Sequence, residues 1–205
     1  MKNSFWKLDR LSLFLIPIGI AINFIGGQVA LLLKLPLYLD SIGTIVVGAL
    51  CGYLPGIIVG LISNLLNSVS DPITMWYAIL NMAFGVVAAY LSTKGVFKVF
   101  WKTLASALIF ALIGGGIGSL MTWVLYGFDF GTGVSSMFAI PLYEALHIPK
   151  YFAQFIAEFT MDIFDKVLTV IAAFGILKAI PTRFLAKLPF GHYYISEEEL
   201  ALEKD

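Results

Sequence analysis

The chain has 205 residues, of which 60% are hydrophobic and only 13% are charged, and its formal net charge is zero. Its mean hydropathy is +0.92. A soluble domain of this length needs more polar surface to cover its core, so the composition predicts an integral membrane protein. The balanced charge offers nucleic acid no basic surface to bind. The one cysteine, Cys51, excludes an intrachain disulfide and a cysteine-based zinc site.

The N-terminus has the basic start and apolar continuation of a signal peptide. However, the apolar stretch at 11–33 is longer than the core of a signal peptide, which has about 7–15 residues, and no convincing cleavage site follows it. We therefore expect this stretch to be retained as a first transmembrane helix that ends at Lys34.

The later apolar segments predict five more helices, since a helix needs about 20 apolar residues to cross the hydrocarbon core. The apolar run at 37–69 is too long for one crossing, and Gly and Pro residues at 52–56 break it, so it predicts two helices. Further helices are expected at 73–92, 103–126 and 151–177, with a longer polar connection at 127–150. The predicted fold is an all-α integral membrane protein with six transmembrane helices.

The Lys and Arg residues give this arrangement an orientation, because they are retained on the cytoplasmic side of a membrane. With six crossings, the side of the N-terminus receives Lys2, Lys7, Arg10, Lys94, Lys98, Lys102, Lys178, Arg183, Lys187 and Lys204. The other side receives only Lys34 and Lys150, and Lys166 lies within a span. Both ends are therefore expected in the cytoplasm of a multi-pass plasma-membrane protein. Its parts are an N-terminus at 1–10, a transmembrane domain at 11–180 and a C-terminal tail at 181–205.

Motifs that would give the chain a chemistry of its own are missing from the sequence. No G-x-x-x-x-G-K-[ST] loop is present to hold ATP, and no H-E-x-x-H or G-x-S-x-G sequence indicates a hydrolase. The two histidines, His147 and His192, are too few and too far apart for a paired metal motif. We therefore expect no catalytic residue, no cofactor for catalysis and no metal. An enzyme acting on lipid would have only Glu158, Asp162 and His147 as acid–base groups.

The last predicted helix carries a polar stripe. Polar residues recur there every four positions, at Gln154, Glu158, Asp162 and Lys166, with Asp165 beside them. Ionisable groups are costly in lipid, so the stripe is expected to face the interior. For Asp165 and Lys166, two interpretations stand side by side: a ligand site, or a buried ion pair of Asp162 with Lys166 that locks two helices together. For Gln154 and Glu158, nearer the outer end, ligand binding is favoured.

Polar residues also gather at the outer ends of other helices, at 38–41 and 64–81. The 127–150 connection is long enough to act as a lid over them. Segments placed in this way can converge on one external cavity, as small-molecule sites do. The candidate substrate-binding residues are Tyr38, Asp40, Asn67, Asp71, Trp76, Tyr77, Asn81, Glu144, His147, Tyr151, Gln154, Glu158 and Asp162. Trp76 and Tyr77 could equally be anchors at the membrane interface.

Small residues recur along one face of the first helix, at Gly19, Asn23, Gly26, Gly27 and Ala30. Such a face lets a neighbouring helix approach closely, and the glycine-rich run at 114–118 offers another. Packing within the chain is the favoured interpretation, and docking of a second membrane subunit is the alternative.

Two segments resemble a known family. Residues Ile16 to Gln28, IPIGIAINFIGGQ, and Leu35 to Thr44, LPLYLDSIGT, are similar to the substrate-binding S components of energy-coupling-factor (ECF) transporters, in particular to the cobalamin-specific ones. The chain length, the six spans, the internal N-terminus and the lack of an ATPase agree with that family. The resemblance covers about residues 8–180.

The resemblance implies a function and partners. An S component captures a vitamin outside the cell and topples in the membrane to release it inside, on a transmembrane scaffold subunit powered by two cytoplasmic ATPases. The family docks through small residues of its first helix, often in an A-x-x-x-A pattern, from which Asn23 departs. Cobalamin is the implied ligand. The alternatives are another vitamin, such as pantothenate or pyridoxine, or a membrane sensor or scaffold module that binds no solute.

The residues themselves bear on the ligand. No Arg lies in any predicted span, and Lys166 is flanked by Asp162 and Asp165, so a strongly anionic vitamin would lack a guanidinium partner. The outer polar groups are acidic or neutral, which favours a bulky, amide-rich ligand and agrees with cobalamin. Lys34 and Lys150 at the rim could still serve an anion.

Overall fold

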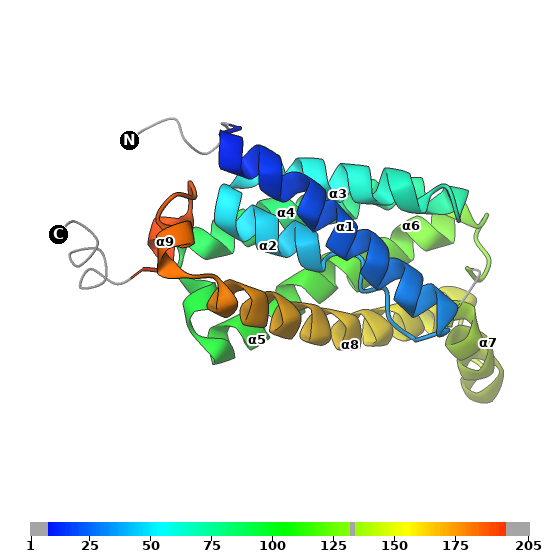
Figure 1. Ribbon diagram of the computed structural model, residues 1–205. Helices are drawn as coiled ribbons and strands as arrows, with labels where there is room; N and C mark the ends of the chain where they lie inside the picture. The colour runs from blue at the N-terminus through cyan, green and yellow to red at the C-terminus, as the bar shows by residue number, and fades with distance from the viewer. Residues whose placement is uncertain (1–7, 132–133, 196–205) are drawn as a thin grey trace.

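Every regular element in the described part of the chain is helical. The computed structural model describes residues 8–131 and 134–195. Its α-helices are α1 (Arg10–Leu32), α2 (Ile42–Cys51), α3 (Tyr53–Asn67), α4 (Ala78–Thr93), α5 (Phe100–Ala111), α6 (Gly118–Leu125), α7 (Val134–Leu146), α8 (Lys150–Ala179) and α9 (Thr182–Leu185), shown in Figure 1. A π-helical turn, η3 (Leu112–Ile117), joins α5 to α6, and shorter 3-10 turns are η1 (Pro72–Met75), η2 (Val96–Lys98) and η4 (Gly191–Tyr193). The predicted all-α class is confirmed for these residues.

Parts of the predicted terminal segments fall outside the described residues. They are residues 1–7, with Lys2 and Lys7, and residues 196–205, with Lys204.

Helix lengths divide the predicted spans into two kinds. α1 and the rod from α5 to α6 (Phe100–Leu125) are long and apolar enough to cross a membrane. α2, α3 and α4 have 10, 15 and 16 residues, and at about 1.5 Å per residue they are shorter than a hydrocarbon core of about 30 Å. α8 has 30 residues but carries the polar stripe. By length and composition, the expectation of six full-length helices is therefore met by two.

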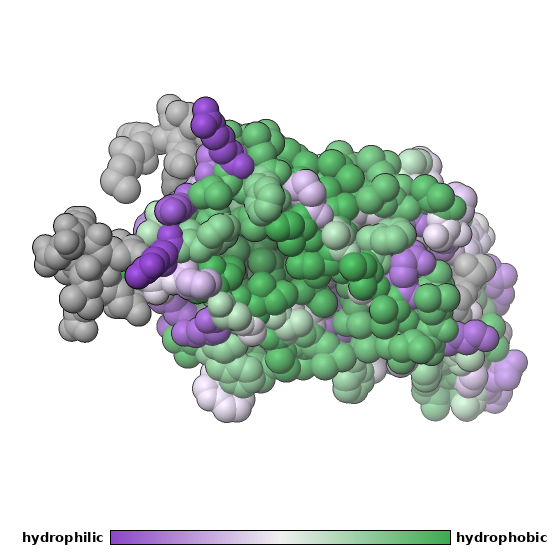
Figure 2. Space-filling view, viewed as in Figure 1, coloured by the Kyte–Doolittle hydropathy of each residue, from purple (hydrophilic) through white to green (hydrophobic). Residues whose placement is uncertain are grey.

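The outer surface of the molecule is largely apolar. Figure 2 shows apolar residues along most of the body on this face, with hydrophilic residues towards its two ends. Large side chains from several helices, including Phe14, Leu32, Trp101 and Phe164, are more than half exposed. A surface of this kind suits contact with lipid or with a membrane partner.

The segment before α2 packs against α8 without forming a helix and becomes buried only at Ser41, and we call residues 35–41 the entry segment. The N–H groups of Tyr38 and Leu39 donate to Oδ1 of Asp165 in α8, at 2.9 and 2.8 Å. The other carboxylate oxygen of Asp165 accepts from Lys166 Nζ at 2.6 Å. Because lipid cannot pair with backbone groups, an irregular segment at this depth needs partners from the protein. One buried carboxylate supplies them.

Asn23 of α1 joins three helices. Its Oδ1 accepts the N–H of Gly43 in the first turn of α2 at 2.6 Å, and its Nδ2 donates to Thr44 Oγ1 and Ser63 Oγ at 2.8 and 2.9 Å. The first N–H groups of a helix have no partner within that helix, and the side chain of Ser41, which precedes α2, makes no capping hydrogen bond. Asn23 therefore caps α2 from a different helix.

The small-residue face of α1 packs inside the chain. Gly19 lies so close to α2 that a Cβ there would be 2.7 Å from Val47 Cγ2, and Gly26 lies against the carbonyl oxygen of Leu39 in the entry segment. The full set of residues, Gly19, Asn23, Gly26, Gly27 and Ala30, is buried or half-buried. Of the two interpretations of this face, the structure shows packing within the chain. Docking of a second subunit at this face stays a prediction.

The chain after α8 folds back onto the bundle. The N–H of Phe190 donates to the Leu50 carbonyl at 2.9 Å, and the Tyr194 hydroxyl donates to the Ala49 carbonyl at 3.4 Å. Both carbonyls belong to the last turn of α2, whose carbonyls lack partners within the helix. The predicted tail from 181 onwards therefore begins as a folded cap on the α2–α3 turn, because this turn needs donors and apolar cover.

Replacing Asn23 by alanine tests the cap that it provides. The variant leaves the Gly43 N–H buried without its acceptor, so we expect the unfolding free energy to fall by about 2–3 kcal/mol. Thermal unfolding in detergent measures the change. Gln28→Ala, which shortens a half-buried amide on the same helix, is the matched control. Equal melting temperatures for the two variants would rule out the capping role.

Candidate functional site

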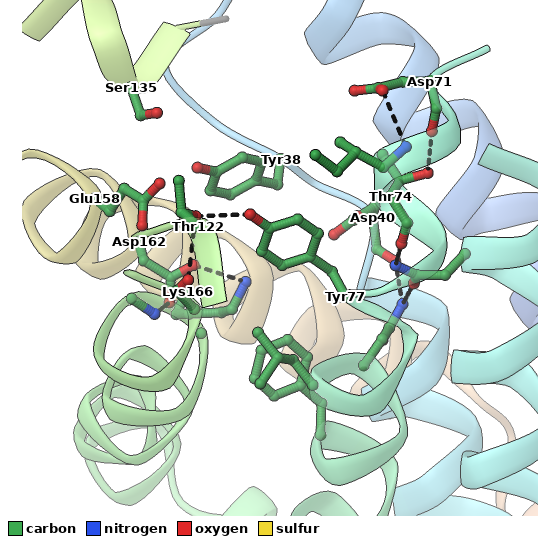
Figure 3. A pocket seen from close by; sticks show the side chains of 18 of the residues that line it. Tyr38, Asp40, Asp71, Thr74, Tyr77, Thr122, Ser135, Glu158, Asp162 and Lys166 are labelled. Carbon is green, nitrogen blue, oxygen red and sulfur yellow. Dashed lines mark hydrogen bonds and ion pairs between the residues drawn. The ribbon is translucent and has the colours of Figure 1, made fainter. Parts of the chain in front are cut away.

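A cavity of about 180 Å³ lies in the interior, between α8 on one side and α3 and α4 on the other. Figure 3 shows Glu158, Asp162 and Lys166 on one side of it and Asp71 and Thr74 on the other. The entry segment, the turn η3, α6 and the start of α7 complete its walls. The α3–α4 connection and α7 both contribute, so the cavity extends towards the end of the molecule where α7 lies, which we call the α7 end (Figure 1).

Three α8 side chains one turn apart, Glu158, Asp162 and Lys166, line the cavity at 6%, 3% and 1% exposure. The ammonium of Lys166 lies 2.6 Å from Asp165 Oδ2 and 3.3 Å from Asp162 Oδ1. It also sits over the ring of Phe84, 4.7 Å from the centroid. The ion pair of Asp162 with Lys166 that the sequence indicated is therefore present, and Asp165 is a second partner. The carboxylates of Asp162 and Asp165 therefore both contact the ammonium of Lys166.

The turn η3 lets α8 approach closely at the height of Asp162. A Cβ on Gly114 would collide with the Asp162 carboxylate, and one on Gly115 would lie 2.7 Å from the Cα of Phe159. The N–H of Gly115 donates to Asp162 Oδ2 at 3.0 Å. π-helical turns are frequent at functional sites because they redirect backbone groups. Here the turn presents a backbone donor to a buried acid.

Two asparagines form a fixed chain of hydrogen bonds on the opposite wall. Asn81 Nδ2 donates to the Asp40 carbonyl at 3.2 Å and to Asn64 Oδ1 at 2.8 Å, and Asn64 Nδ2 donates to the Thr74 carbonyl at 2.9 Å. Because a carbonyl can only accept, the orientation of both amides is determined. Asn81 Oδ1 is left buried without a hydrogen-bond partner in the described chain. This atom is an acceptor without a donor.

Aromatic rings and hydroxyl groups form the rest of the wall. The oxygen atoms of Tyr77 and Thr122 are 2.6 Å apart, and Thr122 Oγ1 also lies 3.1 Å from the Gly118 carbonyl. Either hydroxyl can be the donor in the Tyr77–Thr122 hydrogen bond. The aromatic residues of the lining are Tyr38, Tyr77, Phe84 and Tyr126.

The structure brings together part of the predicted site. The predicted residues that line the cavity are Tyr38, Asp40, Asp71, Tyr77, Asn81, Glu158 and Asp162. Asn67 and Gln154 are buried without lining it, and Tyr151 stacks edge-on against Trp123, 5.6 Å between centroids.

Three predicted residues, Trp76, Glu144 and His147, are exposed and do not line the cavity. Trp76 is 58% exposed at the end of η1. Glu144 lies in the second half of α7 and His147 directly follows it, whereas only the start of α7 reaches the cavity. The acid–base set that a lipid enzyme would need is not assembled, because Glu158 and Asp162 line the cavity and His147 does not.

Sequence reasoning missed lining residues on the helix before the long connection. Gly118, Thr122 and Tyr126 recur every four residues and line one face of the cavity. This spacing was a usable signal, comparable to that of the α8 stripe. Phe84 and Ser135 carried no such signal: Phe84 is one of many apolar residues in its helix, and Ser135 is a single hydroxyl in a long connection.

The 127–150 connection, predicted as a lid, contains α7, which packs against α8. Lys150 and Asp129 form an exposed salt bridge of 2.8 Å near its two ends. The hydrogen bond from Lys150 lowers the pKa of Asp129, and Asp129 raises the pKa of Lys150. The pair therefore holds above the ordinary pKa of an aspartate and is lost as the pH falls through the lowered value. Of the two rim cations that could serve an anion, Lys34 and Lys150, Lys150 therefore already has a carboxylate partner.

Comparison of the chain with protein-family models, with curated proteins and with solved structures finds no match in any of the three. Within residues 8–131 and 134–195, no group of three or more His, Cys, Asp or Glu side chains is placed to hold a metal ion.

The glycines of η3 provide a test of the close approach to α8. Gly115→Ala places a methyl group against the Phe159 backbone, so we expect a loss of about 1–3 kcal/mol in unfolding free energy. Gly116→Ala is the matched control, because a Cβ there meets no atom within 4 Å. Melting temperatures in detergent compare the two. A Gly115→Ala variant as stable as Gly116→Ala would contradict this packing.

Removing the carboxylate of Asp165 tests the anchor of the entry segment. Asp165→Ala leaves two backbone N–H groups unpaired and Lys166 with one carboxylate fewer, so we expect a loss of about 3–5 kcal/mol in unfolding free energy. Asp165→Asn keeps an acceptor for the backbone and should lose less. Proteolysis rates at the entry segment report its release. Equal effects of the two variants would mean that the backbone hydrogen bonds contribute little.

Proposed function

We propose that this chain is the solute-binding subunit of an ECF-type transporter in the plasma membrane, capturing a vitamin from outside for ATP-driven uptake. The observation that carries the proposal is the cavity, in which carboxylates and amides are buried inside a molecule with an apolar surface. Such groups are costly in the interior of a membrane protein and are typical of ligand sites there. The resemblance of the segments at 16–28 and 35–44 to S components supplies the class.

The arrangement of the helices supports six crossings. Five crossings run along the body of the molecule (Figure 1): α1, α3, α4, the rod from α5 to α6, and α8. The sixth would be formed by α2 together with the entry segment. α1 begins and α9 lies at the same end, which agrees with an even number of crossings. Basic residues at that end, such as Arg10 and Arg183, favour placing it in the cytoplasm. The cavity would then face outwards, at the α7 end.

Energy for uptake would come from other subunits, because the sequence contains no phosphate-binding loop. The proposed partners are a transmembrane scaffold and two cytoplasmic ATPases. The small residues of α1 are used within the chain, so the surface left for a scaffold on this helix is its exposed apolar side, including Phe14, Ile18 and Ile25.

Cavity size bears on which vitamin is bound. The cavity of about 180 Å³ is smaller than the roughly 300–1,000 Å³ of sites for drug-sized molecules. A vitamin with one ring, such as pyridoxine, matches this volume better than cobalamin. Cobalamin, the ligand implied by the resemblance, would require α7 and the entry segment to move apart. Pantothenate fits the charges less well, since Lys166 is already paired with two carboxylates.

A panel of vitamins tested on the purified full-length chain decides the proposal. We expect one vitamin to raise the melting temperature in a concentration-dependent way. Asn81→Leu removes a buried acceptor from the cavity and should weaken that binding by about tenfold or more. Asp129→Asn, outside the cavity, is the control and should leave it unchanged.

One result would count against this function, and a second would then favour the alternative. If no vitamin, cobalamin included, stabilises the chain, it is not an S component. If the chain also co-purifies with a membrane partner in that case, the sensor or scaffold alternative is favoured.

A further inference from the structure

The charges that line the cavity are unbalanced. Four carboxylates, those of Asp40, Asp71, Glu158 and Asp162, line it together with one ammonium, that of Lys166. That ammonium is engaged by Asp162 and by Asp165, a further acid that does not line the cavity. It also lies 3.5 Å from Ser41 Oγ and over the Phe84 ring. A buried carboxylate is stabilised either by a counter-charge or by taking up a proton, and the described chain places no second cation in the lining.

Two buried amide oxygens in or beside the cavity wall lack hydrogen-bond partners in the described chain, and both are acceptors. Asn81 is 3% exposed, its nitrogen is held by the Asp40 carbonyl and by Asn64, and its Oδ1 has no donor. Gln154, next to the cavity wall, repeats the pattern: its Nε2 donates to Glu158 Oε1 at 2.8 Å, and its Oε1 has no donor. A ligand that satisfies such atoms must bring hydrogen-bond donors.

The walls and the volume restrict the shape of the ligand. Four aromatic rings line the cavity, those of Tyr38, Tyr77, Phe84 and Tyr126. Aromatic faces attract cations that lie close to them, and Lys166 over Phe84 is an example already in the wall. The volume of about 180 Å³ admits a single ring with short substituents.

We propose that the cavity selects a small organic cation, a flat ring that carries a protonated amine, in preference to neutral or anionic compounds of the same shape. The ammonium would compensate the carboxylates of Asp40 and Glu158 and supply donors to acceptors such as Asn81 Oδ1. This inference rests on the proposed function, because it names the ligand class of the same cavity.

A matched series of pyridines tests the charge preference. The probes are 3-(aminomethyl)pyridine, 3-(hydroxymethyl)pyridine and nicotinate, which share a ring and differ in carrying a cation, a neutral group or an anion. Their affinities for the full-length chain in detergent are measured by ligand-observed NMR and thermal shift. We expect the amine to bind about tenfold or more tightly than the alcohol, since one charge pair in a partly buried site supplies that much, and nicotinate to bind weakest. Sodium chloride at equal concentration should not reproduce the stabilisation.

Isosteric variants locate the preference within the cavity. Asp40→Asn with Glu158→Gln keeps the shape and removes two charges, so binding of the amine should fall to the level of the alcohol. Alcohol binding should stay within about twofold of the original, which also shows that the variant is folded. Asp129→Asn, which is not part of the cavity lining, should retain the preference.

The outcomes separate this inference from the proposed function. Equal or tighter binding of the alcohol or of nicotinate, or equal stabilisation by sodium chloride, overturns the selection of an organic cation and leaves solute binding intact. Persistence of the preference in the Asp40→Asn, Glu158→Gln variant overturns the assignment to these acids. Failure of all three pyridines and of every vitamin overturns both proposals.

Discussion

The structure depends on one buried carboxylate. Asp165 accepts two backbone N–H groups of the entry segment and also binds Lys166. Without those bonds, irregular backbone would be unpaired in the interior, which an apolar environment does not allow. The bonds permit α2 to begin halfway along the bundle, and this position brings Tyr38 and Asp40 into the cavity. A fold with six uniform helices would have filled that space with side chains of a helix.

Lys166 links the anchor to the cavity. Its ammonium contacts Asp165, which holds the entry segment, and Asp162, which lines the cavity and binds the backbone of η3. A ligand that changes the contacts of Asp162 therefore acts on a cation that also supports the entry segment. The site and the irregular segment therefore share one cation: removal of Lys166 leaves two buried carboxylates without it, and removal of either carboxylate leaves Lys166 with one partner fewer.

Close helix packing makes the other wall rigid. At Gly56 and Gly85, where α3 crosses α4, a Cβ on either residue would lie within 3.0 Å of the other backbone. Such contacts, together with the Asn23 cap, hold α1 to α4 as one packed unit. The amides of Asn64 and Asn81 are then fixed by backbone carbonyls, so contacts within the protein alone orient the acceptor of Asn81. A wall that is ordered in advance lowers the entropy cost of binding.

The sequence by itself determined the all-helical class, the apolar surface, the break between α2 and α3, and the α8 stripe, because these follow from composition and from periods of four residues within one helix. It also identified the acids of the cavity and two of its tyrosines, Tyr38 and Tyr77. Only the tertiary structure decided which acid anchors backbone and which faces the cavity, since a helical period gives a face but not the neighbour of that face. For the same reason, only the tertiary structure shows that Asn23 and Gly26 pack inside the chain and that Trp76 and His147 do not line the cavity. It also shows that Phe84 and Thr122 do line it. Those outcomes depend on contacts between residues far apart in the chain, which no local pattern encodes.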